Sequence, residues 1–401
     1  MFKLDPMHVL LFFFIWGIIG SIFSLILIKV GINSNYVFAV KDGVIYCVFC
    51  LFIKLFIRDK QGPLNLLILV VFGFFLILNS FIIKPDYNAK LNNIRQLISP
   101  LVLLFIFLSI KVNNTAFDVA WHWTKAGLGV CFTFGVFELV FSIWELVRLD
   151  VYFNLKGIPV NSAGLSFMFY EPMLNYSKRM TSTFIDPISA GHFFASFLIL
   201  IYAFIRLKEE TGKTAYVFII LAFLGILLCF SKGAMLQLYI GIIIFEPKIF
   251  KFFKCLLLLV PVWVVSVIPE NLSRGLLIHL EGTSNAFSSA TFFGYGIGSS
   301  GNYAKMFSND LALYYKLGIS DSYVGSLIGQ IGFVGLSFWF AIAVYLILCY
   351  SKSAMNFKIA FSIFISIFLV SVMSENTLNV TSFLLPALMI SIGCRKRLGF
   401  S

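Results

Sequence analysis

Long apolar runs alternate with short polar segments along nearly the whole chain. Many of the runs approach or exceed the roughly 18 residues that a helix needs to cross the hydrocarbon core of a bilayer. A β-barrel would instead show short strands of alternating polarity. The pattern therefore predicts an all-α polytopic integral membrane protein, with a single transmembrane domain over residues 1–401.

The apolar runs place about twelve transmembrane helices. Their ranges are 8–29, 36–57, 63–83, 100–110, 118–144, 187–205, 215–230, 234–245, 255–268, 322–350, 359–373 and a last span that ends at Cys394. The fourth range is short for a span, so we expect its helix to include residues before Pro100. Two large loops remain, 145–186 and 269–321.

The basic residues predict the orientation of these spans. Lysines and arginines gather in the short loops, for example in 54–60, 206–213 and 248–254. Because such residues favour the cytoplasmic side, we expect both termini inside. Both large loops then lie on the outer face, which is the periplasm in a Gram-negative cell.

Composition agrees with this interpretation. Apolar residues make up 60% of the chain, charged residues 12%, and the mean hydropathy is +0.96, whereas soluble domains are about a quarter charged. The net charge of +12 comes mostly from short loops, so we expect no nucleic-acid partner. The first apolar run is long and lacks a small-residue cleavage site, so no cleavable signal peptide is expected. Cys47 and Cys50 form a C-x-x-C inside a span, where ordinary packing explains it, and we expect no disulfide.

Four basic residues fall on the predicted outer face, where topology does not require them: Arg95, Arg179, Lys232 and Arg274. A guanidinium can hold a phosphate through two parallel N–H···O bonds. Several cations around one outer cavity therefore suit a diphosphate at the membrane surface. The alternatives are ion pairs with Asp86, Glu171 or Asp186, or contacts with lipid headgroups.

Two residues are candidate catalytic bases on the outer face. His279 lies in the second large loop, and an imidazole with an ordinary pKa of about 6.5 can accept a proton near neutral pH. Asp321 stands at the predicted N-cap of helix 322–350, and a carboxylate beside basic residues could do the same. A structural hydrogen bond for His279 and simple helix capping for Asp321 are the alternatives. The glycine-dense run 294–301 lacks the phosphate-loop pattern, so a tight turn with close backbone approach is expected there.

In order along the chain, these motifs resemble the O-antigen polymerase/ligase superfamily, which includes the Wzy-type polymerases. The matching pieces are Lys41-Asp42, Arg95 ahead of Pro100, the segment 179–187, Ser231-Lys232-Gly233, the segments 279–282 and 294–298, and Asp321-Ser-Tyr-Val324 leading into 332–335. They extend from the second predicted span to the tenth.

The resemblance implies a GT-C-like membrane glycosyltransferase that acts on the periplasmic face of the bacterial cytoplasmic (inner) membrane. Such enzymes use undecaprenyl-diphosphate-linked glycans as donor and acceptor and need no cofactor or metal. In lipopolysaccharide biosynthesis a polymerase joins repeat units, and a partner protein can regulate chain length. Arg95, Arg179, Lys232 and Arg274 would bind the diphosphate, and Asp321 or His279 would be the base.

The resemblance leaves open which reaction the chain performs. Ligases of the superfamily tend to carry a histidine at the head of the helix after the large loop, where this chain has Asp321, and this difference favours a polymerase. An O-antigen ligase is the alternative within the same class. A lipid-linked oligosaccharide flippase is the alternative from another class, although a flippase should show internal repeats and charges at mid-membrane.

Overall fold

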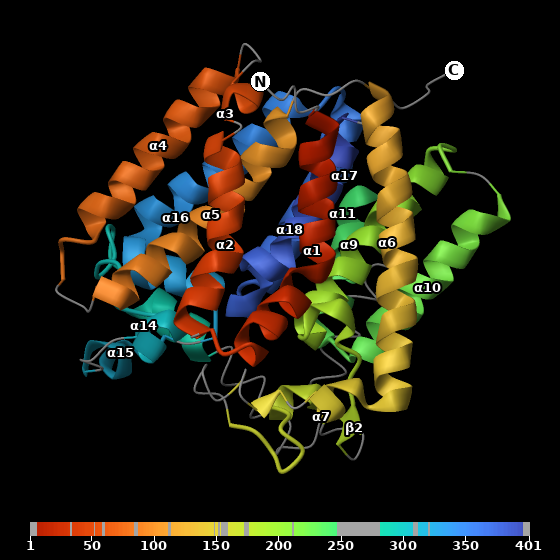
Figure 1. The fold of residues 1–401 in the computed structure, drawn as a ribbon. Coiled ribbons are helices and arrows are strands. Elements are labelled where there is room, and N and C mark those ends of the chain that lie inside the picture. The colour runs from red at the N-terminus through yellow and green to blue at the C-terminus, as the bar shows by residue number, and fades with distance from the viewer. Residues whose placement is uncertain are drawn as a thin grey trace.

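Helices make up most of the chain and run side by side in one bundle (Figure 1). The computed structural model describes residues 6–246 and 281–395, apart from 33, 52, 58–60, 84–86, 111–113, 148, 151–152, 154–158, 172–175, 211, 308–311 and 320. The main helices are α1 (Pro6–Lys29), α2 (Ser34–Leu51), α4 (Gly62–Asn79), α5 (Tyr87–Ser109), α6 (Asn114–Phe141), α9 (Pro187–Arg206), α10 (Lys213–Cys229), α11 (Lys232–Phe245), α16 (Tyr323–Tyr350), α17 (Ala354–Val370) and α18 (Val380–Arg395).

Shorter elements connect the main helices. They are α3 (Ile53–Phe56), α7 (Ile143–Val147), α14 (Asn302–Phe307), α15 (Ala312–Leu317), the 3-10 turns η1 (Phe167–Phe169), η3 (Ser182–Phe184) and η4 (Glu375–Leu378), and the antiparallel strands β1 (Tyr170–Glu171) and β2 (Ser177–Lys178). Residues 281–288 are helical as well. The described cysteines are all free thiols.

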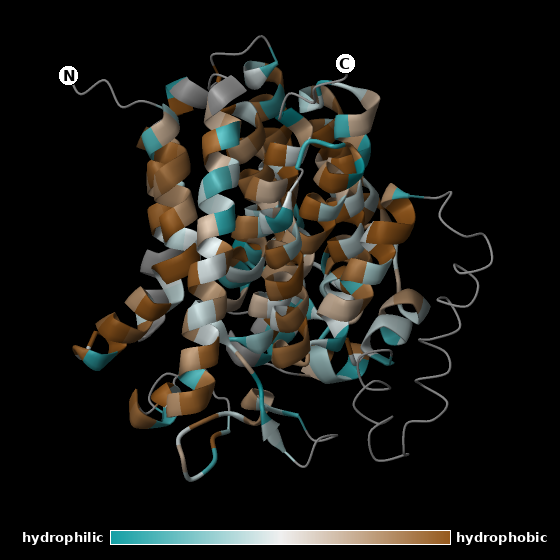
Figure 2. Ribbon diagram, turned by 90° about the vertical axis from the view of Figure 1, so that its right-hand side faces the viewer, coloured by the Kyte–Doolittle hydropathy of each residue, from teal (hydrophilic) through white to brown (hydrophobic). Residues whose placement is uncertain are grey.

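Six of the described helices are long and apolar enough to cross a membrane: α1, α4, α5, residues 116–141 of α6, α9 and α16. Four more, α10, α11, α17 and α18, are apolar but shorter. Hydrophobic residues cover most of the length of many helices (Figure 2). The chain therefore has the all-α architecture of a membrane-embedded protein, as predicted.

The main helices lie at the positions of eleven predicted spans. The range predicted for the ninth span, 255–268, lies outside the described residues, so the number of twelve stays a prediction. One boundary differs from expectation. The predicted span 118–144 breaks at Ser142, whose φ is +49°, and α7 continues separately beyond the break.

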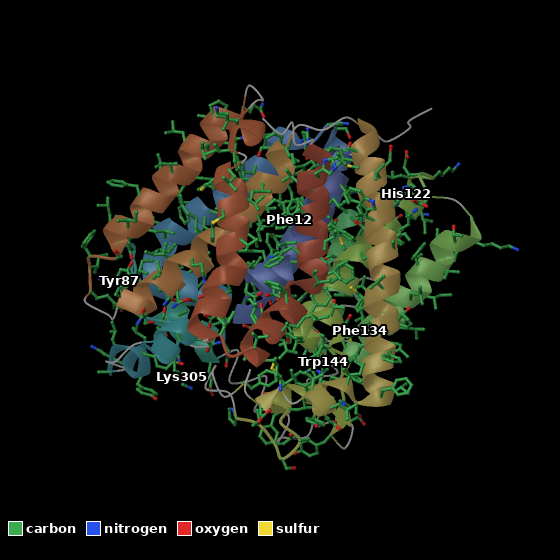
Figure 3. The ribbon with its side chains drawn as sticks, viewed as in Figure 1. Phe12, Tyr87, His122, Phe134, Trp144 and Lys305 are labelled. Carbon is green, nitrogen blue, oxygen red and sulfur yellow. The ribbon has the colours of Figure 1, made fainter. Side chains whose placement is uncertain are left out.

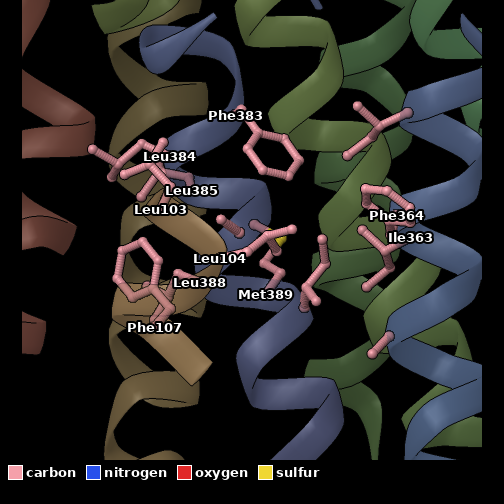
Figure 4. Close-up of a cluster of buried hydrophobic side chains, with 14 of the residues drawn as sticks. Leu103, Leu104, Phe107, Ile363, Phe364, Phe383, Leu384, Leu385, Leu388 and Met389 are labelled. Atoms are coloured by element: carbon pink, nitrogen blue, oxygen red, sulfur yellow. The ribbon is translucent and has the colours of Figure 1, made fainter. Parts of the chain in front are cut away.

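Helices α9 and α18 form the centre of the bundle. Nearly every residue of each is buried, because α9 packs against α10, α11 and α18, while α18 also packs against α5 and α17. In Figure 4, Leu385 and Met389 of α18 lie between Phe107 of α5 and Phe364 of α17. A helix that is apolar all round is expected in the core of such a bundle.

Small residues let these helices approach closely, as is usual between membrane helices. A Cβ atom on Gly191 of α9 would lie 2.7 Å from the Cβ of Ser231 and 2.9 Å from the Cβ of Ala234, at the start of α11. Gly225 of α10 packs in the same way against the ring of Phe194. Any larger residue at either glycine would separate two helices.

Helix α5 begins at Tyr87 and so extends well before Pro100, as expected from the short apolar run. Proline has no N–H to donate to the carbonyl oxygen four residues earlier, which leaves the Gln96 carbonyl without its helical partner. The hydroxyl of Tyr323 donates to this oxygen at 3.2 Å, and the indole N–H of Trp339 donates to the Leu97 oxygen at 2.9 Å. Two side chains of α16 therefore supply hydrogen-bond donors to the backbone carbonyl oxygens at the irregular turn of α5.

One end of the bundle is held together by Arg395, the last residue of α18. Its Nη1 donates to the carbonyl oxygens of Leu108 (2.6 Å) and Ile110 (2.7 Å), and its guanidinium lies over the rings of Phe117 and Tyr350. The ends of α5, α16 and α18 and the start of α6 thus meet there. The starts of α16 and α18 lie at the opposite end.

The orientation of the bundle can be tested with paired phosphatase and fluorescent-protein reporters. Fusions after Lys213 and Lys358 should report the cytoplasm, because they lie at the end of the bundle where basic residues gather. Fusions within 300–318 should report the external side. A cytoplasmic signal from 300–318 would overturn both the orientation and the assignment of the site described below.

Candidate functional site

Two clusters of polar side chains lie at the end of the bundle opposite Arg395. The first, called the cation cluster, contains Arg179, Lys232, Glu171 and Asp186. The second, called the carboxyl cluster, contains Glu375, Asp321, Asn302 and Gln96. In Figure 3, Trp144 of α7 and Lys305 of α14 mark this end, and His122 of α6 marks the other.

The segment after α7 folds locally to form the cation cluster. The Asn161 side-chain oxygen accepts hydrogen bonds from the backbone N–H groups of Ala163 and Leu165, both at 3.0 Å, and this closes a turn. Pairing of β1 with β2 then places Glu171 opposite Ser177, two residues before Arg179. The hairpin thereby brings Glu171 and Arg179 to the same surface.

Arg179 is half-buried and binds the C-terminal end of α10. Its Nε donates to the carbonyl oxygen of Cys229 (2.9 Å), Nη2 to that of Phe230 (3.2 Å) and Nη1 to that of Met168 (3.2 Å). A cation at this position complements the negative end of the helix dipole. Burial lowers the pKa of Arg179, and the charges of Glu171 and Asp186 oppose this shift.

Two of the five N–H groups of Arg179 have no acceptor among the described residues. The side chain is therefore first a cap for α10, with limited capacity left for an anion. The sequence did not indicate this role, because residues 179 and 229 are distant in the chain.

Lys232 is the first residue of α11, and its side chain is 62% exposed. Its Nζ lies 3.1 Å from Glu171 Oε1, and the Glu171 side chain is only 6% exposed. Lys232 thus makes the ion pair with Glu171 that is the alternative to diphosphate binding for an outer cation. Because most of the Lys232 side chain is exposed, its ammonium group can reach a ligand as well.

Glu138 of α6 anchors the backbone that follows Arg179. One carboxylate oxygen accepts hydrogen bonds from the N–H groups of Thr181 (2.7 Å) and Ser182 (3.3 Å) and from the Thr181 hydroxyl (3.1 Å). The Glu138 side chain is fully buried. This contact fixes the chain between the hairpin and α9 and so determines where Arg179 lies.

Asp321 precedes α16 but is not its N-cap, so the predicted capping role was wrong. Ser322 is the N-cap, and its hydroxyl accepts a hydrogen bond from the N–H of Gly325 at 2.8 Å. Asp321 has a left-handed backbone with φ of +52°, a conformation that Asp tolerates better than most residues. Its carboxylate is thus available for other contacts, and Oδ1 accepts from the Asn302 amide at 2.8 Å.

Glu375 lies in η4, between α17 and α18, and is only 3% exposed. Its Oε2 accepts from the backbone N–H of Asn302 at 2.7 Å, and its Oε1 accepts from Gln96 Nε2 at 2.9 Å. Burial raises the pKa of Glu375 to about 7, the two hydrogen bonds lower it, and Asp321 adds a smaller increase. A carboxyl group with this pKa can accept or release a proton near neutral pH.

The glycine-dense segment 294–301 holds the carboxyl cluster against α16. Helix α16 breaks at Gly332, where φ is +69°. The backbone N–H groups of Tyr295 and Gly296 donate to the carbonyl oxygens of Gly329 (2.8 Å) and Gln330 (3.0 Å) beside the break. The predicted close backbone approach is confirmed, since a Cβ on Gly294 or Gly332 would collide with the facing backbone.

Gln330 joins this segment to α5. Its side-chain oxygen accepts from the N–H of Gly298 at 2.9 Å, and its amide nitrogen donates to Asn93 Oδ1 at 3.0 Å and to Ser326 Oγ at 2.7 Å. All of these groups are buried. The buried Gln330 side chain therefore gives the Gly298 N–H a hydrogen-bond partner, and an unpaired N–H there would destabilise the apolar bundle.

The other sequence candidates are only partly placed. Arg95 is half-buried on α5, directly before Gln96. Arg274 and His279 lie outside the described residues, and so do the side chains of Lys41 and Asp42. The structure thus brings Arg179 and Lys232 together around Glu171, and places Asp321 in the separate carboxyl cluster.

Sequence reasoning gave no role to Glu375, Gln96 or Asn302. Glu375 could have been found from the sequence, because it is the one acidic residue between Lys352 and Arg395. An isolated carboxylate between apolar spans is a candidate functional group. Among the described residues, no three His, Cys, Asp or Glu side chains are arranged to hold a metal ion. Independence from metal stays a prediction.

Comparison with known proteins adds no assignment. No family model matches the chain, and searches of curated proteins and of solved structures gave no match.

Helix α16 offers a direct test of the glycine contact. Gly332→Ala should destabilise the protein by about 1–3 kcal/mol, because the residue needs a positive φ and a Cβ would meet the Phe292 carbonyl. Thermal unfolding in detergent measures the loss as a lower Tm. Gly43→Ala on α2 is the matched control, since a Cβ there has no atom within 4 Å among the described residues. Equal Tm values for the two variants would contradict the contact.

Proposed function

We propose that this chain is a membrane glycosyltransferase that polymerises undecaprenyl-diphosphate-linked oligosaccharide repeat units into O-antigen or a related surface polysaccharide. The observation that carries the proposal is the presence of the cation cluster and the carboxyl cluster at one end of an apolar helical bundle. Transfer from a lipid diphosphate needs both kinds of group at the membrane surface. The ordered motifs that resemble the polymerase/ligase superfamily point to the same reaction.

The cation cluster has the donors that a leaving diphosphate needs. Lys232 offers an exposed ammonium held by one carboxylate, and Arg179 has two N–H groups left after capping α10. Fixed donors aimed at developing negative charge stabilise a transition state without reorganisation. Glu171 orients Lys232, so a diphosphate would share or replace this ion pair. Arg95 and Arg274 would complete the set.

The carboxyl cluster supplies the base. Asp321 is partly exposed, and only its Oδ1 accepts a hydrogen bond from the described residues. In the proposed step, the acceptor hydroxyl oxygen forms a bond to the anomeric carbon while the bond from that carbon to the diphosphate oxygen breaks. The bonding electron pair leaves with the diphosphate, and the hydroxyl proton moves to Asp321 Oδ2. His279 is the second candidate for this role.

The orientation of the bundle supports a reaction on the periplasmic face of the bacterial inner membrane. Exposed basic residues such as Arg206 and Lys213 gather at the end opposite the two clusters, and this end would face the cytoplasm. Donor and acceptor glycans would then meet outside, with their polyprenyl tails in the surrounding lipid. A chain-length regulator would be a protein partner on the same face.

A deletion strain distinguishes the polymerase from its two alternatives. A polymerase mutant should carry a single repeat unit on lipid A-core when its polysaccharide is resolved on a gel. Loss of all glycan from the core, with lipid-linked polymer retained, would instead identify an O-antigen ligase. Lipid-linked single repeats trapped in the inner leaflet would identify a flippase.

Lys232→Gln tests the diphosphate contact, and the fold should be retained because the glutamine amide can still donate to the enclosed Glu171 carboxylate. A hydrogen bond to a charged group contributes about 1.5–3 kcal/mol, so the polymerisation rate should fall roughly tenfold to a hundredfold. The polymerisation rate is measured in membrane vesicles with lipid-linked substrate. Lys213→Gln is the control, since Lys213 is also the exposed first residue of a helix but lies at the other end. Equal rates would remove Lys232 from the site.

Asp321→Asn tests the base. Asparagine accepts the left-handed backbone and can still bind Asn302, so the protein should accumulate normally while polymer formation is lost. His279→Gln should be milder. The ladder of polymer lengths in complemented deletion cells measures both variants. Normal polymer from Asp321→Asn together with no polymer from His279→Gln would transfer the role to the histidine.

A further inference from the structure

Glu375 connects three parts of the chain that are remote in sequence. Its two carboxylate oxygens bind Gln96 of α5 and the backbone of Asn302 at the start of α14. Asn302 in turn binds Asp321 through its side-chain amide. Asn302 is therefore a bridge between the two carboxyl groups, and a change at Glu375 reaches Asp321 through one residue.

Gln96 shows a second feature of this contact. It is 5% exposed, its Nε2 donates to Glu375, and its Oε1 has no hydrogen-bond partner among the described residues. If Glu375 gains a proton on Oε1, rotation of the Gln96 amide by half a turn lets Oε1 accept that proton in a hydrogen bond. The same pair of side chains thus fits both the ionised and the protonated carboxyl group.

Several other charged or titratable groups lie on the elements packed around Glu375. They are Asp321 and Tyr323 at the start of α16, Tyr87, Lys90 and Arg95 on α5, Lys305 on α14, and Asp186 and His192 at the start of α9. Lys358 of α17 and Arg395 of α18 lie at the opposite end. Of these groups, Asp321 contributes to raising the pKa of Glu375.

We propose that Glu375 is a positioning residue: in its ionised form it binds the backbone N–H of Asn302 and so holds the Asn302 amide against Asp321, which keeps Asp321 directed at the sugar hydroxyl. This inference rests on the proposed glycosyl transfer. When Glu375 is ionised, its hydrogen bond from the Asn302 N–H is charge-assisted and holds Asn302 firmly. When Glu375 is protonated, this hydrogen bond weakens, Asn302 holds Asp321 less firmly, and transfer slows. The proton of the hydroxyl passes to Asp321 and then to water, and Glu375 is unchanged by the reaction.

The pH profile of polymerisation tests this relation. Initial rates in membrane vesicles should rise on the order of threefold to tenfold through an inflection near pH 7, the pKa of Glu375. Glu375→Gln keeps the shape but not the charge: its side-chain oxygen can accept from Asn302, and its NH2 can donate to the rotated Gln96 amide. It should therefore give a flat profile at the low-pH rate of the wild type. Glu246→Gln, a carboxyl change at the opposite end, should keep the wild-type profile. An unchanged inflection in Glu375→Gln overturns the inference.

Gln96→Met covers the case in which Glu375→Gln does not accumulate. Methionine has a similar length but cannot donate to the carboxylate, and because this hydrogen bond lowers the pKa of Glu375, its loss should move the inflection to higher pH. A merely structural role for Gln96 would lower the rate at all pH values without moving the inflection, and that result would also overturn the inference.

Infrared difference spectroscopy of the purified protein in lipid nanodiscs separates this inference from the proposed function. A carboxylic-acid C=O band should disappear on titration through pH 7 in the wild type and be absent from Glu375→Gln. A band that persists in Glu375→Gln shows that another group titrates and overturns the assignment. If the wild type makes no product at any pH while the band behaves as expected, the glycosyltransferase proposal fails and the proton site on Glu375 stands.

Discussion

Backbone hydrogen bonding inside an apolar bundle is the constraint on which the rest of this structure depends. Where α5 turns at Pro100 and α16 breaks at Gly332, carbonyl and amide groups lose their helical partners, and lipid offers none. Tyr323, Trp339 and the segment 294–301 replace them. These replacements fix the start of α16 against α5, and Asp321 and Gln96 are positioned as a result.

The two polar clusters are linked by a chain of hydroxyl groups. Asp186, the N-cap of α9, accepts from the Ser189 hydroxyl, and this hydroxyl lies 2.6 Å from that of Ser382 on α18. The backbone N–H of Ser382 donates to Asn379, directly after η4. The cation cluster and the segment that carries Glu375 therefore share one support, as the proposed transfer would require of a site that holds a leaving group and a base together.

The chemistry of the site depends on different degrees of burial. Lys232 is mostly exposed and Asp321 partly so, whereas Glu375 is almost completely enclosed. An exposed cation can meet a substrate diphosphate at low desolvation cost, and an enclosed carboxyl group holds a proton near neutral pH because burial disfavours its charge. The roles proposed for Asp321 and Glu375 differ because their burial differs.

The sequence by itself determined the helical class and the positions of the main helices, because long apolar runs are a local property. It also anticipated the close approach at Gly294. It did not determine that Ser322 caps α16, that Arg179 caps α10 or that Asn302 joins Glu375 to Asp321. These contacts join residues up to 73 positions apart, and only the packing of the helices decides which polar groups meet and how deeply each is buried.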